Sequence, residues 1–186
     1  MKQLLTSVFS LCLFVCAYSQ SHELASRSGS GAYVLKFDTM QFARAFAANV
    51  APAMSEQFKQ DFVFAGISID DPNPLDSKVE AYVTVSMHSS TQNITIGLIL
   101  NKTVLAGGIT KLNITGTNVA REGDWKCTSA IKDCGGCKKI RSEGSVVGCK
   151  CINDQTKYYN FEVTGGDGGK FPGWISSILT VLLRMA

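Results

Sequence analysis

Five of the seven cysteines lie close together near the C-terminal end of the chain, and they restrict the fold more than any other feature. They are Cys127, Cys134, Cys137, Cys149 and Cys151. The other two fall within residues 1–19, where a lysine, a short apolar run and small residues before Gln20 predict a cleaved secretory signal peptide. An exported chain meets an oxidising environment, so we expect the remaining cysteines to form disulfide bonds.

The cysteine-rich segment 127–151 predicts a β-hairpin closed by a three-residue loop, with Gly144 in the left-handed conformation at the end of that loop. In this register Cys137 faces Cys149, so we expect a disulfide between Cys137 and Cys149. Cys151 points to the same side of its strand as Cys149, and Cys134 is its nearest candidate partner. One thiol is left over, for an intermolecular bond or as a buried free thiol.

A metal or redox site is the alternative interpretation of these cysteines. Cys134 and Cys137 have the CxxC spacing of a zinc knuckle or of a thioredoxin-like pair. Zinc requires thiolates, which export disfavours, and a redox pair should stand at the start of a helix that the residues after Cys137 do not predict. We therefore expect disulfides, with no metal and no cofactor.

The part of the chain before the cysteines predicts one helix followed by antiparallel strands. Asp38 can cap the helix with Gln41 closing a capping box, and Phe42, Phe46 and Val50 recur at helical spacing. From Asp61 onwards apolar and polar residues alternate along several short segments, which is the strand pattern. The predicted fold class is α+β, an antiparallel meander with one helix across a face, and a β-sandwich is the alternative.

The chain divides into four parts by composition. After the signal peptide, residues 20–31 predict a flexible leader, and residues 32–164 predict a single α+β domain. Residues 165–186 predict a glycine spacer followed by an apolar C-terminal helix or a processed tail. The apolar segment 171–186 can dock on the domain, lie on a membrane surface, or be a tail removed for a lipid anchor at the cell surface.

Three N-glycosylation sequons stand at Asn93, Asn101 and Asn113. All three fall on the polar side of predicted strands or at strand ends. A glycan cannot be buried, so we expect that face of the sheet to be open to water, at least locally. The opposite, apolar face should pack against the helix.

Positive charge gathers on the cysteine-rich hairpin, although the net charge of the chain is only +3. Lys138, Lys139, Arg141 and Lys150 are the candidate binding residues there, with an anionic surface or glycan as the possible partner. Nucleic acid is not expected, because an exported domain of such low charge lacks the basic footprint that nucleic-acid binding requires.

No catalytic constellation is evident in the sequence. The only histidines are His22 and His88. Asp70, Asp71 and Asp76 flank a proline-rich turn and could hold calcium, but such a cluster is more typical of an ordinary polar turn. We therefore predict a secreted, N-glycosylated extracellular binding or structural protein and not an enzyme. The alternative is a carrier of an apolar ligand or lipid held between helix and sheet, lined by Phe42, Phe46, Val83 and Val85.

Overall fold

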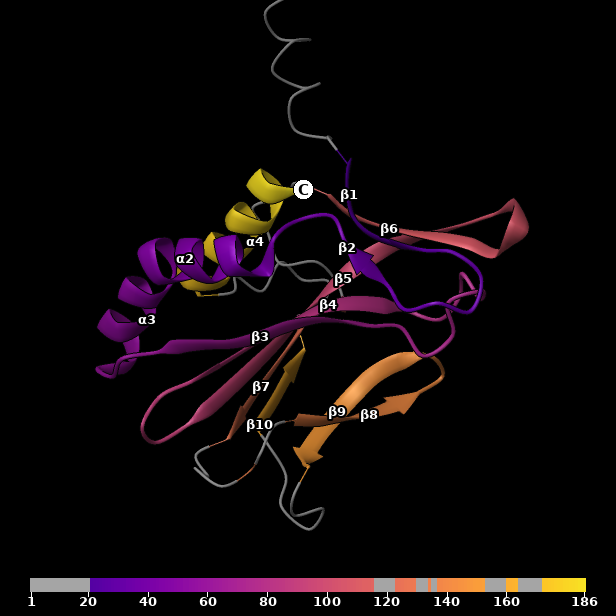
Figure 1. Cartoon of the computed structure of the whole chain (residues 1–186). Coiled ribbons are helices and arrows are strands. Elements are labelled where there is room, and N and C mark those ends of the chain that lie inside the picture. Colours follow the sequence, from indigo (N-terminus) through magenta and orange to yellow (C-terminus); the bar gives the residue numbers. More distant parts are fainter. Residues whose placement is uncertain (1–20, 116–122, 130–133, 135–136, 153–159, 164–171) are drawn as a thin grey trace, which may run out of the picture.

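The computed structural model describes residues 21–115, 123–129, 134, 137–152, 160–163 and 172–186. The predicted signal peptide and the whole glycine spacer at 165–169 lie outside these residues. The described chain has the α+β fold that the sequence predicts, with three helices on one face of an antiparallel sheet and a separate hairpin on the other (Figure 1).

The strands are β1 (Ser21–Arg27), β2 (Val34–Leu35), β3 (Val63–Asp70), β4 (Ala81–His88), β5 (Asn93–Leu105), β6 (Ile109–Thr115), β7 (Trp125–Ser129), β8 (Cys137–Ser142), β9 (Ser145–Cys151) and β10 (Asn160–Val163). The helices are α2 (Thr39–Asn49), α3 (Ala51–Phe58) and α4 (Gly173–Met185), with a short 3-10 turn over Ala106–Gly108. Strands β8 and β9 form the hairpin, and the other strands form an eight-stranded sheet.

The long strand β5 organises the sheet. On one side it pairs with β4 from Asn93 to Leu100. On the other side its first half pairs with β7 and its second half with β6, so that two different strands continue the sheet from the same edge. Between them, where neither β6 nor β7 pairs with β5, the Ile99 amide donates to the carboxylate of Asp124 at 2.7 Å. A part-buried backbone donor is thereby satisfied at the point where the sheet branches.

The helices form as the capping signals predict. Asp38 accepts hydrogen bonds from the amides of Met40 and Gln41, which satisfies free donors in the first turn of α2. The rings of Phe37 and Phe42 lie 5.9 Å apart across this N-terminus, as a hydrophobic staple requires. The helical segment is interrupted at Val50, and Pro52 occupies the first turn of α3, where a proline costs no helical hydrogen bond.

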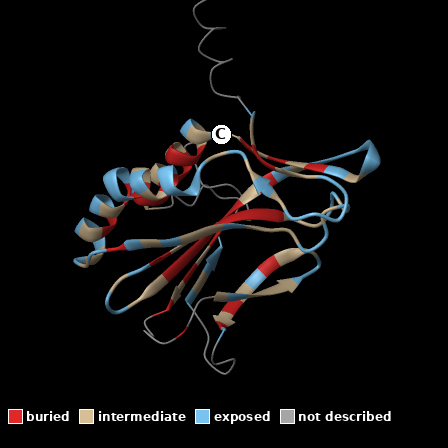
Figure 2. Cartoon of the chain, viewed as in Figure 1, coloured by how far each residue is buried: buried red, intermediate tan, exposed pale blue. Residues whose placement is uncertain are grey.

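The main core lies between these helices and the sheet, and strand β4 is buried along almost its whole length (Figure 2). The C-terminal helix α4 belongs to this core, with Trp174, Ile178 and Leu182 almost completely buried. Residues 173–185 therefore pack on the domain in the structure, while processing of the tail and membrane contact stay predictions. Within the described residues, none of the helices has the length and apolar content needed to span a bilayer.

The predicted boundaries of the domain are too narrow. Residues 20–31 were expected to form a flexible leader, but Ser21–Arg27 is strand β1, which pairs with β6 and β2. A bulge between Glu23 and Ala25 turns both Leu24 and Ala25 into fully buried residues. The segment has too few apolar residues to show the alternation of a strand. It is held in place by pairing with β6, which lies far away in the sequence, so no local pattern predicts it. The folded unit therefore extends beyond 32–164 at both ends.

Candidate functional site

The second face of the sheet carries its own small core, over which the hairpin β8–β9 lies. Tyr82, Trp125 and Val146 are buried there together with four of the cysteines. Gly97 in β5 makes room for the indole ring of Trp125, because a Cβ atom at this position would lie only 2.2 Å from that ring. The predicted polar face of the sheet is therefore covered at Tyr82 and Thr84, and it is open to water only in other places, such as Asn101.

The register of the hairpin differs from the predicted one by two residues. Glu143 and Gly144 both have positive φ, so the loop is a two-residue turn and not a three-residue one. Gly144 is in the left-handed region, as expected. A bulge at Val147 shifts the register once more, and Cys137 consequently faces Cys151, while Cys149 faces Lys139.

This register changes one of the two predicted disulfides. The structure contains the Cys134–Cys151 bond that the sequence predicts, which we call the second disulfide. The predicted Cys137–Cys149 bond is wrong, because Cys149 instead bonds to Cys127 of β7, which we call the first disulfide. Cys137 remains a free thiol. The first disulfide therefore ties strand β9 of the hairpin to the main sheet.

Arg141 holds the hairpin on the sheet and does not present its charge to a partner. Its guanidinium lies 2.9 Å from the Asp70 carboxylate and donates to the carbonyl oxygens of Gly144, at 2.7 Å, and Glu80, at 3.3 Å. It also stacks over the ring of Tyr82, 5.4 Å from the centroid. These contacts join β3, β4 and the hairpin turn, so the guanidinium of Arg141 is already engaged within the chain, and a role for Arg141 in binding stays a prediction.

The other predicted binding lysines are divided between the two faces of the hairpin. Lys138 and Lys150 are directly opposite each other on the outward face. Lys139 points inward, and its ammonium lies 3.4 Å from Asp70. Asp70 therefore faces two cations, Lys139 and Arg141, and the formal charges of these three groups leave one positive charge beneath the hairpin.

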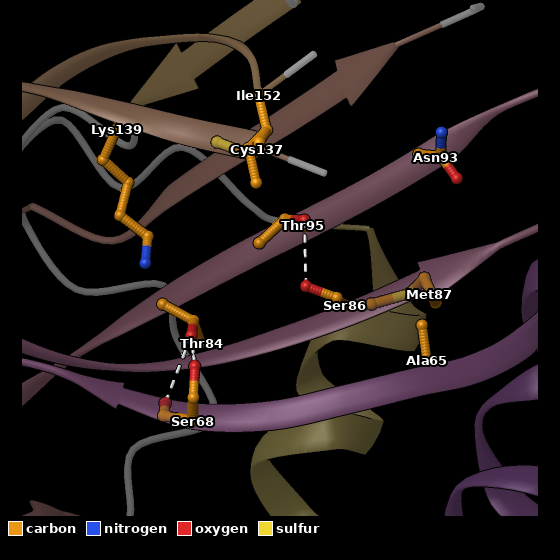
Figure 3. A pocket seen from close by; sticks show the side chains of 10 residues that line it. All are labelled: Ala65, Ser68, Thr84, Ser86, Met87, Asn93, Thr95, Cys137, Lys139 and Ile152. Carbon is orange, nitrogen blue, oxygen red and sulfur yellow. Dashed lines mark hydrogen bonds between the residues drawn. The ribbon is translucent and has the colours of Figure 1, made fainter. Parts of the chain in front are cut away.

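Beneath the hairpin is a groove of about 340 Å³, between the sheet and the inward side of strand β8 (Figure 3). Its floor consists of side chains from β3, β4 and β5, and Lys139, Cys137 and Ile152 form the wall on the hairpin side. The ten lining residues are Ala65, Ser68, Thr84, Ser86, Met87, Asn93, Thr95, Cys137, Lys139 and Ile152. The volume lies at the lower end of the range typical of small-molecule sites, about 300–1,000 Å³.

A β-bulge brings Ala65 into this groove. The sequence predicts that Val63 and Ala65 share the core face with Ile67 and Ile69. In the structure Phe64 pairs with Met87 and Gly66 with Ser86, so Ala65 is an extra residue and the sides exchange at this point. Val63 is exposed as a result, and Phe64 packs against the core in its place.

Two pairs of hydroxyl groups form the centre of the floor. The Ser68 and Thr84 hydroxyls lie 2.7 Å apart, and Thr84 also donates to the Ser68 carbonyl at 3.1 Å. Because Thr84 has one hydroxyl proton, Ser68 must donate within the pair, which leaves acceptor lone pairs on both oxygens. The Ser86 and Thr95 hydroxyls lie 3.1 Å apart and use only one of their two protons on each other. The floor therefore offers more acceptors than donors.

The free thiol of Cys137 is half-buried at the wall of the groove. Burial raises its pKa to about 12, an effect that the positive charge of Lys139 opposes and the negative charge of Asp70 reinforces. At neutral pH the group is therefore a neutral thiol. It donates to the Sγ atom of Cys127 at 3.3 Å.

The acidic turn considered for calcium is occupied by a lysine side chain. The Lys102 ammonium donates to the Asp71 carboxylate at 2.7 Å and to the carbonyl oxygens of Asn73 and Asp76 at 2.9 and 3.0 Å. The Tyr33 hydroxyl donates to the other Asp71 oxygen at 2.5 Å. Burial of the tyrosine, and to a lesser extent this hydrogen bond, raises the pKa of Tyr33. The ammonium takes the place among these oxygens that a cation would occupy, so the turn is structural.

The three sequons have different surroundings. Asn93 is half-buried and lines the groove, whereas Asn101 is exposed on β5. Asn113 is half-buried and lies directly opposite Asn101 in the β5–β6 pair. Glycosylation of these residues remains a prediction, and a glycan on Asn93 would stand at the edge of the groove.

The side chains proposed to line an apolar ligand site are part of the packed core. Phe42, Phe46, Val83 and Val85 are each at most 1% exposed, and none of them lines the groove. His22 lies in β1 and His88 at the end of β4, and neither lines the groove. Comparisons of this chain with protein-family models, with curated proteins and with solved structures found no match.

Of the groove residues, only Lys139, Cys137 and Asn93 were predicted as site residues. The hydroxyls were recognisable only as the polar side of the alternating strands. A possible signal is that several of these polar positions, Ser68, Thr84, Ser86 and Thr95, carry short hydroxyl side chains in the middle of strands, where a fully solvated face would tolerate longer charged ones.

Proposed function

We propose that this chain is an exported extracellular binding module that holds an acidic saccharide in the groove between the sheet and the hairpin. The observation that carries the proposal is the combination of a floor rich in hydroxyl acceptors with the inward-pointing ammonium of Lys139. A sugar supplies hydroxyl donors for the floor, and its carboxylate or sulfate supplies the acceptor for Lys139. The proposal assigns binding and not catalysis.

The charge beneath the hairpin supports an anionic ligand. Asp70 is the only carboxylate paired with Lys139 and Arg141 among the described residues, so one positive charge is not balanced by it. Lys139 has three ammonium protons, and a single contact to Asp70 leaves protons available for a ligand. Because Lys139 is partly shielded from water by the hairpin, an ion pair there is screened less than one on the open surface.

Two features support the proposal that the chain is exported. The sequence of residues 1–19 predicts a signal peptide, which would direct secretion. The two disulfides are of the kind that persists in oxidising compartments. The function we propose is therefore recognition of a glycan outside the cytoplasm, with the hairpin as the covering element of the site.

The proposal is tested by calorimetric titration with an oligosaccharide that ends in a uronic acid, and with its neutral counterpart. The uronic acid should bind more tightly, and its affinity should fall as salt rises. Lys139→Met should weaken binding roughly tenfold to a hundredfold, because hydrogen bonds to charged groups contribute about 1.5–3 kcal/mol. Asn93→Gln serves as a second background, since it removes any glycan from the edge of the groove.

The matched control is Lys138→Met, which removes the same charge from the preceding residue, whose side chain lies on the outward face of the strand. It should leave binding almost unchanged. If the neutral saccharide bound as tightly as the acidic one, or if Lys138→Met weakened binding as much as Lys139→Met, the groove would not be the site.

A further inference from the structure

Three sulfur atoms come together at the junction of the hairpin and the sheet. The Sγ atoms of Cys127, Cys137 and Cys149 all lie within 4.8 Å of one another, and the free thiol of Cys137 is 3.3 Å from Cys127. Each atom comes from a different strand: β7, β8 and β9. The cluster thus consists of a disulfide and a thiol in van der Waals contact with it, although the sequence places these residues far apart.

We propose that Cys127, Cys137 and Cys149 form an exchange triad through which the protein interconverts between two disulfide isomers. The Cys137 thiol loses its proton, and the thiolate attacks the Sγ atom of Cys127. The Cys127–Cys137 bond forms while the Cys127–Cys149 bond breaks, and the Cys149 sulfur leaves as a thiolate that takes up a proton. One thiol and one disulfide are present before and after the step, so no oxidant or reductant is consumed.

The surroundings of the three sulfurs support this exchange. Cys127 is fixed, because β7 is paired with β5 on one side and with β10 on the other, and its side chain is fully buried. Cys137 and Cys149 belong to the hairpin, which is a separate two-stranded sheet. The exchange therefore transfers the bond to the main sheet from strand β9 to strand β8, without changing the strand pairing of the main sheet.

The exchange also changes the proposed binding groove, although it does not depend on a ligand. In the present isomer the thiol of Cys137 lines the groove and Cys149 is buried. In the other isomer Cys137 is bonded to the sheet and the free thiol is at Cys149. The wall that carries Lys139 is then tied directly to β7 through a residue two positions away, which restricts the movement of that wall relative to the floor.

The rate of exchange should depend steeply on pH. The attacking species is the thiolate, and the pKa of Cys137 is about 12 because the group is buried, with Lys139 lowering it and Asp70 raising it. At pH values below this pKa, the thiolate fraction therefore rises roughly tenfold for each unit by which the pH increases. Exchange should be slow near neutral pH and faster in alkaline solution.

The test is disulfide mapping of the oxidised protein after incubation between about pH 7 and pH 9. Samples are quenched in acid, denatured, labelled with N-ethylmaleimide and digested without reduction. We expect a peptide labelled at Cys149 and a linked Cys127–Cys137 peptide to increase with time, at a rate that rises about tenfold per pH unit. If the label remained on Cys137 alone throughout this range, the proposal would be overturned.

Two variants separate this exchange from other routes. Cys137→Ser lacks the attacking thiol, and no label should reach Cys149; a label on Cys149 in this variant would contradict the assigned step. Cys149→Ser leaves Cys127 and Cys137 as neighbours, and they should form a disulfide in the folded variant, whereas two persistent thiols would count against the triad. Mapping of the wild-type protein decides the question if this variant does not fold.

Discussion

Replacing Lys102 with methionine removes the cation around which the turn between β3 and β4 is built. The Lys102 and Asp71 side chains are 3% and 0% exposed, and the ammonium also serves the carbonyl oxygens of Asn73 and Asp76. Among the described residues, the variant therefore leaves the buried Asp71 carboxylate with the Tyr33 hydroxyl as its remaining side-chain partner. Loss of one member of a buried ion pair costs about 3–5 kcal/mol, because the remaining charge is desolvated without compensation.

This loss should be measured as the free energy of unfolding in urea. In a domain of this size 3–5 kcal/mol corresponds to a fall in Tm of roughly 6–20 °C. The matched control is Lys111→Met, which breaks an ion pair of the same length, 2.7 Å, between side chains that are 43% and 27% exposed. Such a partly exposed pair contributes about 0–1 kcal/mol.

Removal of the partner's charge as well tests the reasoning further. Lys102→Met combined with Asp71→Leu removes both charges, and it should recover much of the stability lost in the single variant, since an apolar pair needs no compensation. The account of this turn would be refuted if Lys102→Met were no more destabilising than Lys111→Met. It would also be refuted if the double variant lost a further amount of about 3–5 kcal/mol relative to the single variant.

Three other perturbations follow from the structure. Gly97→Ala places a Cβ atom 2.2 Å from the ring of Trp125 and should destabilise the protein by about 1–3 kcal/mol or more in urea unfolding, with altered tryptophan fluorescence. Serines in place of both cysteines of the second disulfide, which spans a sequence separation of 17, should cost roughly 3 kcal/mol through chain entropy, measured by the same assay. Hydrogen bonding to Lys111 is the main cause of a lowered pKa at Glu23, followed by a smaller opposing effect of burial and further lowering by Lys36. The ionised carboxylate therefore stabilises the fold above its ordinary pKa near 4.5, and this contribution is lost as pH falls through the lower value in the folded state. Glu23→Gln should accordingly show a smaller loss of stability than the wild type between about pH 6 and pH 3.

The fold class was predictable because its signals are local. The cap at Asp38, the staple between Phe37 and Phe42, and the alternation along β4 each specify one element from neighbouring residues. Strand β1 was missed because its seven residues contain little apolar pattern and are held by pairing with β6. Such pairing depends on chain segments that are distant in sequence, and no local rule reveals it.

The hairpin shows how a small error in register alters a site. A two-residue turn and one bulge shift the pairing by two residues, which replaces Cys149 by Cys151 opposite Cys137. The same alternation that correctly placed Cys149 and Cys151 on one side could not specify the loop length. The disulfide between Cys127 and Cys149 then follows from the packing of the hairpin on Trp125 and Tyr82, which is a tertiary contact.

The binding residues were predicted from charge alone, and charge does not show which way a side chain points. Arg141 donates its hydrogen bonds to Asp70 and to two carbonyl oxygens, whereas Lys139 faces the groove. The hydroxyls of the floor become meaningful only when the hairpin is placed over them. A polar stripe on a strand predicts solvent exposure unless another element covers it, as it does here.

The groove can be examined most directly by methyl NMR, because five of its lining residues carry methyl groups. These are Ala65, Met87 and Ile152, together with Thr84 and Thr95 of the hydroxyl pairs. Addition of glucuronic acid to the intact oxidised protein should shift these five methyl signals in a saturable manner, while the methyl signals of α4 on the opposite face stay in place. Shifts confined to other parts of the molecule, or none at millimolar ligand, would contradict the assignment of this groove as the binding site.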